Sequence, residues 1–437
     1  MLTVGLFCAG LLAYALFSGL LERRSITAQI VMLVLGVGLG LALRGTPEAI
    51  VETELLHIAG ELALILALVV DAARIDIGAL RRTAGLPIRL LVIGLPLTIV
   101  AGTIVAVLLL PGISLLEAVI VSTLLAPTDA ALGAMVVNSR FVPRRIRQAL
   151  NVESGLNDGL VTPIVLVAAA LAVAGGDLGD TAWIADAVAQ IAFGAIAGIV
   201  VGVVGALALR FAVAREWMND GTHWMAAPAI GFLAWFVAHE LGGNVFVAAF
   251  AAGLSMTAAY GRVPESFLVF AEVGGELLGL MVFFLFGALL VEIGNSISVP
   301  VILYALLSLT VIRMLPVAIA LRGTQLRGST VAFIGWFGPR GLASVVLTLV
   351  ALGDGDGTPP FGATIVAAVA VTIALSVIAH GLSAGPAAER YGAFVATLPE
   401  DAAEHKHTTE LPTRRGVNRT SVTSDPSIGS SAAVRSP

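Results

Sequence analysis

Charged residues are scarce in this chain of 437 residues: only 12% are Asp, Glu, Lys or Arg, whereas 58% are hydrophobic. A soluble globular chain carries about 25% charged residues, so the composition excludes that class. Lys406 is the only lysine and Cys8 the only cysteine. A single cysteine excludes a disulfide within the chain. The sequence therefore predicts an all-α polytopic membrane protein.

Long apolar runs recur from end to end. About thirteen of them approach or exceed the roughly 18 to 20 residues that cross a bilayer. They lie at 3–21, 27–43, 54–71, 86–110, 115–137, 147–173, 183–209, 223–239, 244–259, 267–291, 299–321, 328–352 and 361–383. The first run has no basic flank before it, which favours a retained helix over a cleaved signal peptide.

Arginines gather in every second loop between these runs. The basic loops contain Arg23, Arg24, Arg74, Arg81, Arg82, Arg89, Arg140, Arg144, Arg145, Arg147, Arg210, Arg215, Arg262, Arg322 and Arg327. The other loops contain Arg44 and the acidic stretches 177–180 and 353–357. Because basic loops are retained in the cytoplasm, we expect an odd number of crossings of the cell membrane. The amino terminus would lie outside and the carboxyl terminus in the cytoplasm.

The composition changes at about Gly385, where Ser, Thr, Pro and charged residues replace the apolar pattern. We interpret 385–437 as a disordered cytoplasmic tail, which leaves 1–384 as the membrane domain. The tail contains the cluster Glu404-His405-Lys406-His407. Two histidines on a mobile segment make a poor metal site, so we interpret this cluster as solvated.

Two apolar runs are interrupted near their middle. Residues 124–133 contain Pro127 and Asp129, and residues 335–342 contain Pro339 and Arg340. These two runs, the fifth and the twelfth, would cross in opposite directions, as in two inverted six-helix repeats joined by one extra helix. Paired breaks of this kind indicate a transporter's binding site. The charges would balance the free helix ends beside them, whereas two simple proline kinks would leave the charges unexplained.

The sixth run contains Glu153-Ser154-Gly155-Leu156-Asn157-Asp158-Gly159, with two carboxylates deep in an apolar segment. Ionisable groups at that depth usually mark an ion or proton path. At about 100° per residue, Asp158 shares a helical face with Ser154 and Asn157, while Glu153 lies about 140° away. We therefore assign Asp158 to an ion site and Glu153 to a structural ion pair. A buried charge needs a partner, and the candidates are Arg313, which is the better placed, and Arg340.

The order of these motifs resembles the monovalent cation:proton antiporters, in particular the sodium/proton exchangers of the NhaP and NHE type, over roughly residues 3 to 384. The family's motifs are matched by Thr128-Asp129 in the fifth run, by Glu153-Ser154-x-x-Asn157-Asp158-Gly159 in the sixth and by Gly338-Pro339-Arg340-Gly341 in the twelfth. Ala130 stands where the family usually has proline, and Pro127 is the candidate for the break instead. Asp71 falls where the family's third helix has an acidic residue.

The resemblance implies an antiporter fold like that of NhaA and NapA and a secondary exchanger of Na⁺ or Li⁺ for H⁺. It implies no enzymatic chemistry, no cofactor and no nucleic-acid partner. The implied ion-binding or proton-binding residues are Asp158, Asn157, Ser154, Thr128, Asp129 and Asp71, with Asp158, Ser154 and Thr128 as Na⁺ ligands. Asn157 stands where the electrogenic branch has a second aspartate, which favours electroneutral exchange. From the residues alone, Asp71 is equally well explained as a charge at a helix end.

The family also implies two rigid bodies. A core of about 54–173 and 267–383 would move against a scaffold of about 3–43 and 183–259. Gly194, Gly198 and Gly202 lie at helical spacing in the scaffold and would allow close helix packing. That packing suits either a homodimer interface or the interior of one subunit.

Two other functions fit the same residues. A K⁺/H⁺ antiporter of the same superfamily differs only in cavity geometry. An ion channel or an ion-regulated membrane sensor fits the buried Asp158 and the paired breaks less well. The remaining polar residues of the apolar runs are expected to lie near helix ends, without a transport role. They are His57, Glu61, His239, Glu240, Glu272, Glu276 and His380.

Overall fold

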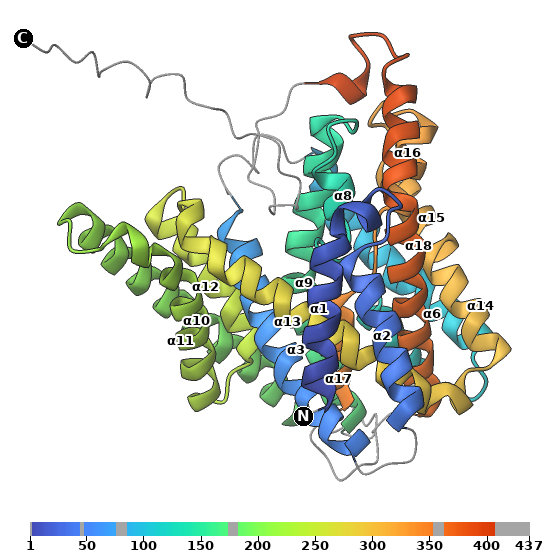
Figure 1. Ribbon diagram of the computed structural model, residues 1–437, viewed down its shortest axis with the longest axis horizontal. Helices are drawn as coiled ribbons and strands as arrows, with labels where there is room; N and C mark the ends of the chain where they lie inside the picture. Colours follow the sequence, from blue (N-terminus) through green and yellow to red (C-terminus); the bar gives the residue numbers. More distant parts are fainter. Residues whose placement is uncertain (1, 44–47, 76–84, 174–181, 353–361, 407–437) are drawn as a thin grey trace, which may run out of the picture.

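The computed structural model describes residues 2–43, 48–75, 85–173, 182–352 and 362–406. Over these residues the protein is helical and contains no strand, as predicted (Figure 1). Seven of the described helices are long and apolar enough to cross a membrane, and three more are apolar but shorter. Several predicted crossings consist of two short helices, so the number thirteen stays a prediction.

The helices follow the predicted runs closely. In chain order they are α1 (Leu2–Glu22), α2 (Ala28–Leu43), α3 (Glu48–Ala73), α5 (Gly85–Arg89), the π-helix η1 (Leu90–Gly94), α6 (Leu95–Leu109), α7 (Leu115–Leu124), α8 (Ala134–Val137), α9 (Arg144–Val173), α10 (Ala182–Ala214), η2 (Asp220–Met225), α11 (Ala226–Glu240), α12 (Val245–Tyr260), α13 (Glu265–Glu292), η3 (Ile293–Ser296), α14 (Val299–Leu309), α15 (Val311–Ala320), α16 (Gly328–Trp336), α17 (Leu342–Leu352), α18 (Ala363–Val395) and η4 (Ala403–His405).

Both predicted breaks are present. The fifth run divides into α7 and α8, and the twelfth into α16 and α17, with unwound backbone between the halves. A capping box fixes the start of α7, because Ser114 Oγ accepts the N–H of Glu117 while the Glu117 carboxylate accepts that of Ser114. The helix ends before Pro127, which has no N–H to continue the ladder. The breaks touch, since the N–H of Asp129 donates to the carbonyl of Pro339 at 2.7 Å.

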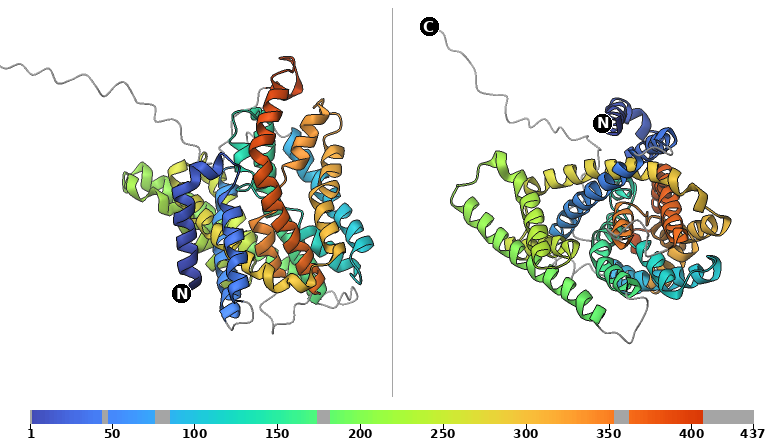
Figure 2. Two further views of the ribbon diagram at one scale, coloured as in Figure 1. Left: turned by 45° about the vertical axis from the view of Figure 1, so that its right-hand side comes forward. Right: turned by 90° about the horizontal axis from the view of Figure 1, so that it is seen from below.

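The helices pack in two groups, which lie side by side in the view from below (Figure 2) and are called the two bodies here. One contains α10, α11 and α12 together with α2, α3 and α13. The other surrounds the two breaks. An apolar cluster of that second body joins α5, α8, α9, α15, α16 and α18.

The division differs from the predicted one at two helices. We expected the third and tenth runs in the core, but α3 packs mainly against α12 and α13, and α13 mainly against α2 and α3. Both helices therefore pack with the helices expected to form the scaffold, and the division into two rigid bodies stays a prediction. The two long helices form the wall that faces the core, and sequence order alone does not reveal this.

The glycine stripe of α10 packs inside the subunit. A Cβ on Gly194, Gly198 or Gly202 would collide with backbone atoms of α12, at Asn244, Ala248 and Ala252 respectively. Of the two interpretations offered by the sequence, the structure therefore uses these glycines for packing within one chain.

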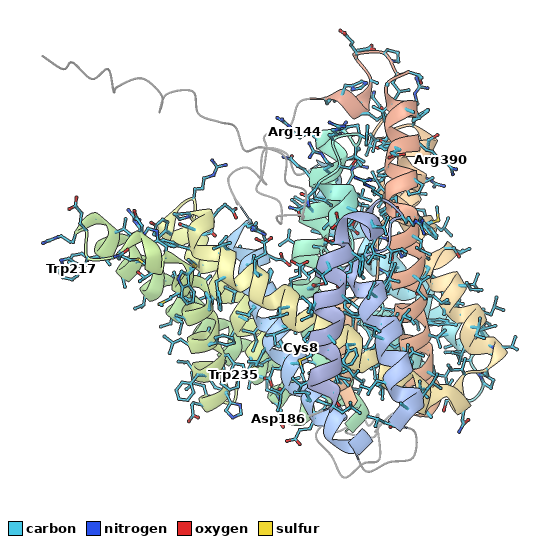
Figure 3. The ribbon with its side chains drawn as sticks, viewed as in Figure 1. Cys8, Arg144, Asp186, Trp217, Trp235 and Arg390 are labelled. Carbon is cyan, nitrogen blue, oxygen red and sulfur yellow. The ribbon has the colours of Figure 1, made fainter. Side chains whose placement is uncertain are left out.

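The ends of the described chain lie at opposite ends of the molecule. The amino terminus and Asp186 lie at one end, and Arg144 lies at the other, together with η4 (Figures 1 and 3). An odd number of crossings requires such an arrangement. Of the residues used to predict the loop charges, Arg44, Arg81, Arg82 and the stretches 177–180 and 353–357 lie outside the described residues.

The predicted tail begins earlier than the structure allows. Helix α18 continues ten residues past 385, to Val395, and the chain then turns back so that Glu404 is only 1% exposed. The predicted solvated cluster is thus partly buried at Glu404. Residues 407–437, the rest of the predicted tail, lie outside the described residues.

Candidate ion-binding site

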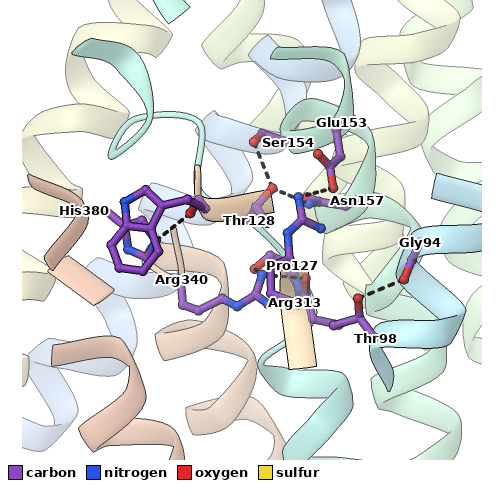
Figure 4. A network of polar contacts seen from close by, with 12 residues as sticks. Gly94, Thr98, Pro127, Thr128, Glu153, Ser154, Asn157, Arg313, Arg340 and His380 are labelled. Atoms are coloured by element: carbon purple, nitrogen blue, oxygen red, sulfur yellow. Dashed lines mark hydrogen bonds and ion pairs between the residues drawn. The ribbon is translucent and has the colours of Figure 1, made fainter. Parts of the chain in front are cut away.

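A buried polar cluster forms where the first break meets α9. The Thr128 hydroxyl lies in the unwound segment after α7, and its oxygen is 2.9 Å from Ser154 Oγ (Figure 4). Asn157 Nδ2 donates to the same Thr128 oxygen at 2.7 Å. Thr128, Ser154 and Asn157 are therefore gathered at one point. Asn157 holds the unwound segment against α9 through its amide.

Asp158 stands one helical turn after Ser154 on α9 and lines a cavity between the two bodies. Gln29 of α2, Glu272 and Glu276 of α13, and Leu342 of α17 also line this cavity. Gln29 and Glu272 come from the ends of α2 and α13 that carry the basic loops, so the cavity lies on the side of Asp158 where the arginines gather. Its lining is rich in carboxylates, which raises the local concentration of cations.

Asp71 is buried near the end of α3, with 8% exposure, and packs against α9. A Cβ on Gly155 would lie 3.6 Å from the Asp71 Cβ. Asp71 is thus beside the helix that carries Ser154 and Asp158. The neighbouring Arg74 forms ion pairs with Glu272 at 2.7 Å and with Glu265 at 2.9 Å, both on α13.

Both oxygens of the Asp129 carboxylate accept hydrogen bonds from main-chain N–H groups. Its Oδ1 accepts the N–H groups of Ala131 at 2.7 Å and Leu132 at 3.0 Å. Its Oδ2 accepts the N–H of Leu342, the first residue of α17, at 2.7 Å. The carboxylate from the first break therefore caps the helix that follows the second break, where the helix dipole favours negative charge.

Arg340 makes the reciprocal contact. Its Nη1 donates to the carbonyls of Ala126 at 3.0 Å and Pro127 at 3.2 Å, at the carboxyl end of α7. Each break thus supplies the charge that stabilises a helix end of the other. The sequence placed both charges beside helix ends but expected each to act on its own break.

Glu153 forms an ion pair with an arginine. Its Oε1 lies 2.6 Å from Nη2 of Arg313 on α15, and both side chains are almost fully buried (Figure 4). Arg313 was the better placed of the two candidates proposed from the sequence. The pair joins α9 to α15 inside the core body.

Sequence reasoning did not select two groups of residues in this region. Glu276 lines the same cavity as Asp158, and Glu272 pairs with Arg74. Glu272 and Glu276 are one turn apart inside α13, which is otherwise apolar between its terminal residues, and that spacing was the available signal. His380, which we expected near a helix end, is 1% exposed and lies against the second break.

Each of the two broken helices carries a charged side chain that binds a helix end of the other. They lie beside a carboxylate in a cavity between two groups of helices, an arrangement typical of a membrane-embedded secondary transporter. A model of the family described as "Sodium/hydrogen exchanger, transmembrane" matches residues 11–390. The chain belongs to this sodium/hydrogen exchanger family. Its members are transporters of cations and protons rather than enzymes.

Solved structures show the same fold. The structure of the sodium proton antiporter MjNhaP1 from Methanocaldococcus jannaschii at pH 8 superposes with a TM-score of 0.71 at 22% identity, over 90% of this chain and 99% of that chain. An electron-microscopy map of the same antiporter gives a TM-score of 0.69 at 21% identity, over 89% of this chain and 97% of that chain. No curated protein matches the chain.

Proposed function

We propose that this protein exchanges Na⁺ or Li⁺ for H⁺ at a single carboxylate, that of Asp158. The observation that carries the proposal is the position of Asp158, which lines the cavity between the bodies one turn from Ser154 and its partner Thr128. The sodium/hydrogen exchanger family model and the fold shared with a sodium proton antiporter support it.

The chemistry of the cluster suits a hard monovalent cation. The Asp158 carboxylate, the Ser154 and Thr128 hydroxyls and carbonyls freed by the first break are oxygen ligands. Asp71 is an indirect ligand, placed against α9 beside them. In this proposal Asp129 is a helix cap rather than a ligand, because three N–H groups already occupy its oxygens. Asn157 positions Thr128 through its amide.

Competition at Asp158 would couple the two ions. When its carboxylate is ionised it attracts the cation, and when it is protonated it has no charge for the cation to neutralise. The loaded forms, with a proton or a cation, would cross between inward-open and outward-open states, and the empty charged form would not. Because Asn157 stands beside Asp158 and supplies no second titrating group, each cycle would move one proton per cation without net charge.

The charge pattern gives the proposed orientation. With the arginine-rich loops in the cytoplasm, the cavity on the arginine side of Asp158 faces inward and the amino terminus lies outside the cell membrane. We also propose a homodimer through the scaffold. The glycines of α10 do not supply that interface, since α12 covers them.

The test uses purified protein in liposomes that contain an internal pH dye. A pH gradient is imposed, and Na⁺, Li⁺ or K⁺ is then added to the native chain, to Asp158→Asn and to the control Asp186→Asn, which changes an exposed carboxylate of α10. We expect Na⁺ and Li⁺ to dissipate the gradient with the native chain and the control, but not with Asp158→Asn.

Each alternative gives a different result. Dissipation by K⁺ alone would identify a K⁺/H⁺ antiporter. Cation flux without proton movement would indicate a channel. Equal exchange by Asp158→Asn and the native chain would refute the site.

A further inference from the structure

The second break removes one main-chain hydrogen bond at its centre. In a continuous helix the N–H of Arg340 would donate to the carbonyl of Trp336, four residues earlier. Here α16 ends at Trp336 and α17 begins at Leu342, so this pair is separated. Buried main-chain groups in a membrane protein must find other partners, because hydrocarbon offers none.

Helix α18 supplies both partners. The N–H of Arg340 donates to Ser376 Oγ at 2.6 Å, and His380 Nε2 lies 2.8 Å from the carbonyl oxygen of Trp336. His380 Nδ1 lies 3.1 Å from Ser376 Oγ and 2.9 Å from the Ser376 carbonyl oxygen. Ser376 is fully buried and His380, which is labelled in Figure 4, is 1% exposed.

These distances fit one directional chain of hydrogen bonds. A carbonyl only accepts, and a neutral imidazole has one N–H, so His380 can donate to the Trp336 carbonyl or to the Ser376 carbonyl but not to both. The hydrogen is assigned to Nε2, because the Ser376 carbonyl lies inside α18 and has a main-chain donor there, whereas the break separates the Trp336 carbonyl from its own. In the neutral imidazole, Nδ1 is then an acceptor for the Ser376 hydroxyl, whose oxygen accepts from Arg340. The main-chain bond between Arg340 and Trp336 is thus replaced by a relay through a hydroxyl and an imidazole.

The relay ends at the residue that holds the first break. Arg340 has its N–H fixed by Ser376, while its guanidinium donates to the carbonyls of Ala126 and Pro127. The next residue after Pro127 is Thr128, whose hydroxyl meets Ser154. The position of Thr128 therefore depends on the position of Arg340, and that depends on α18.

We propose that Ser376 and His380 are positioning residues for the cation site: they replace the broken main-chain bond of the second break and so hold Arg340, Thr128 and the ligand geometry in place. This inference rests on the proposed function. It gives two polar residues of α18 a role in cation affinity although neither lines the cavity.

A neighbouring contact provides a matched control. Ser383, one turn after His380 on the same helix, accepts a hydrogen bond from the Trp336 indole at 3.0 Å. It touches the same tryptophan but not the main chain of the break. Ser383→Ala should therefore leave cation affinity unchanged, whereas Ser376→Ala and His380→Leu should not.

The experiment measures exchange in liposomes over a range of Na⁺ concentrations. For Ser376→Ala and for His380→Leu we expect the concentration for half-maximal exchange to rise roughly tenfold, as for the loss of one buried hydrogen bond. The maximal rate should change much less. The double variant should be no worse than His380→Leu, because both changes cut one relay. His380→Gln, whose amide can donate and accept, should restore most of the affinity.

Two results would overturn the inference: native Na⁺ affinity in both single variants, or a double variant whose loss equals the sum of the two single losses. The native chain and the Asp158→Asn variant are run in parallel, so failure of the relay is distinguished from failure of the proposed function. If the native chain exchanges no cation, the proposed function fails. The coupling between Ser376 and His380 is then measured from melting temperatures in detergent, where additive losses would refute the relay.

Discussion

Glu153 and Arg313 place two opposite charges deep inside the core body. Their contact of 2.6 Å is almost fully shielded from solvent, with side chains 3% and 2% exposed. In such a setting the attraction within the pair is largely offset by the cost of removing both ions from water. The pair therefore adds little net stability, but the loss of one member leaves an uncompensated charge.

We predict that Arg313→Met destabilises the protein by about 3–5 kcal/mol, because Glu153 would stay buried without its partner. The double variant Glu153→Met with Arg313→Met should recover most of that loss. Thermal unfolding in detergent measures both, and Arg390→Met, at an exposed position of α18, is the control. A double variant less stable than Arg313→Met would contradict this account.

The contacts of a side chain could be predicted where its partners are close in sequence, but not where they are distant. The angle between Glu153 and Asp158 follows from one helix, and in the structure Glu153 pairs with Arg313 while Asp158 lines the cavity. The partner of Asp129 could not be found in this way, because the N–H that it accepts belongs to Leu342, 213 residues later. Only the folded arrangement of the two breaks brings that amide to the carboxylate.

Gly341 sits where the two breaks are closest. A Cβ at this position would collide with the Asp129 carboxylate, which must approach to cap α17. We predict that Gly341→Ala displaces this cap, lowers stability by about 1–3 kcal/mol and reduces exchange. Melting temperature and liposome exchange measure the two effects. Gly328→Ala, where a Cβ meets nothing within 4 Å, is the matched control.

The close contact of α10 and α12 predicts that a large side chain between these helices destabilises the protein. Gly198→Leu would force these helices apart, because even a Cβ at this position collides with Ala248. We expect a loss of stability of at least about 1–3 kcal/mol, measured by thermal unfolding in detergent. Gly38→Leu makes the same change on an open face of α2. Similar melting temperatures for the two variants would show that the α10–α12 contact is not tightly packed.

Helix breaks and close helix contacts could be predicted where particular residues in the sequence mark them. Proline, glycine and a charge inside apolar runs revealed both breaks, and small residues at helical spacing revealed the close contact of α10. The grouping of helices was less accessible. Nothing in the runs that form α3 and α13 distinguishes a core helix from the scaffold wall, because both are apolar over most of their surface.

At the scale of the whole molecule, the segment after α18 joins the ends of three helices. Glu404 Oε1 accepts the N–H of Arg327 and the hydroxyl of Thr330, each at 2.8 Å, at the start of α16. Arg145 of α9 donates to the carbonyl of Ala403. The Tyr391 hydroxyl of α18 donates to Thr330 at 3.1 Å. This docked segment, residues 396–406, therefore ties α9 and α18 to the broken twelfth crossing.

Docking of this segment should depend on pH through Glu404. Burial opposes ionisation of the carboxylate, but the hydrogen bonds from Arg327 and Thr330 outweigh it and lower the pKa of Glu404 below its ordinary value of 4.5. A lowered pKa in the docked state means that ionisation stabilises docking. That stabilisation is fully present above pH 4.5 and is lost as the pH falls through the lower pKa of the docked carboxylate.

We therefore predict that acidification releases the docked segment and that Glu404→Gln makes docking independent of pH. Hydrogen exchange of the amides of residues 397–406, compared between variants at each pH, measures this directly. The native chain should be protected at neutral pH and lose protection as the pH falls below 4.5, whereas Glu404→Gln should show one level throughout. Glu400→Gln removes an exposed carboxylate of the same segment and should behave like the native chain. If Glu404→Gln loses protection on acidification as the native chain does, another group controls docking, and the hydrogen bonds to Arg327 and Thr330 do not set its pH dependence.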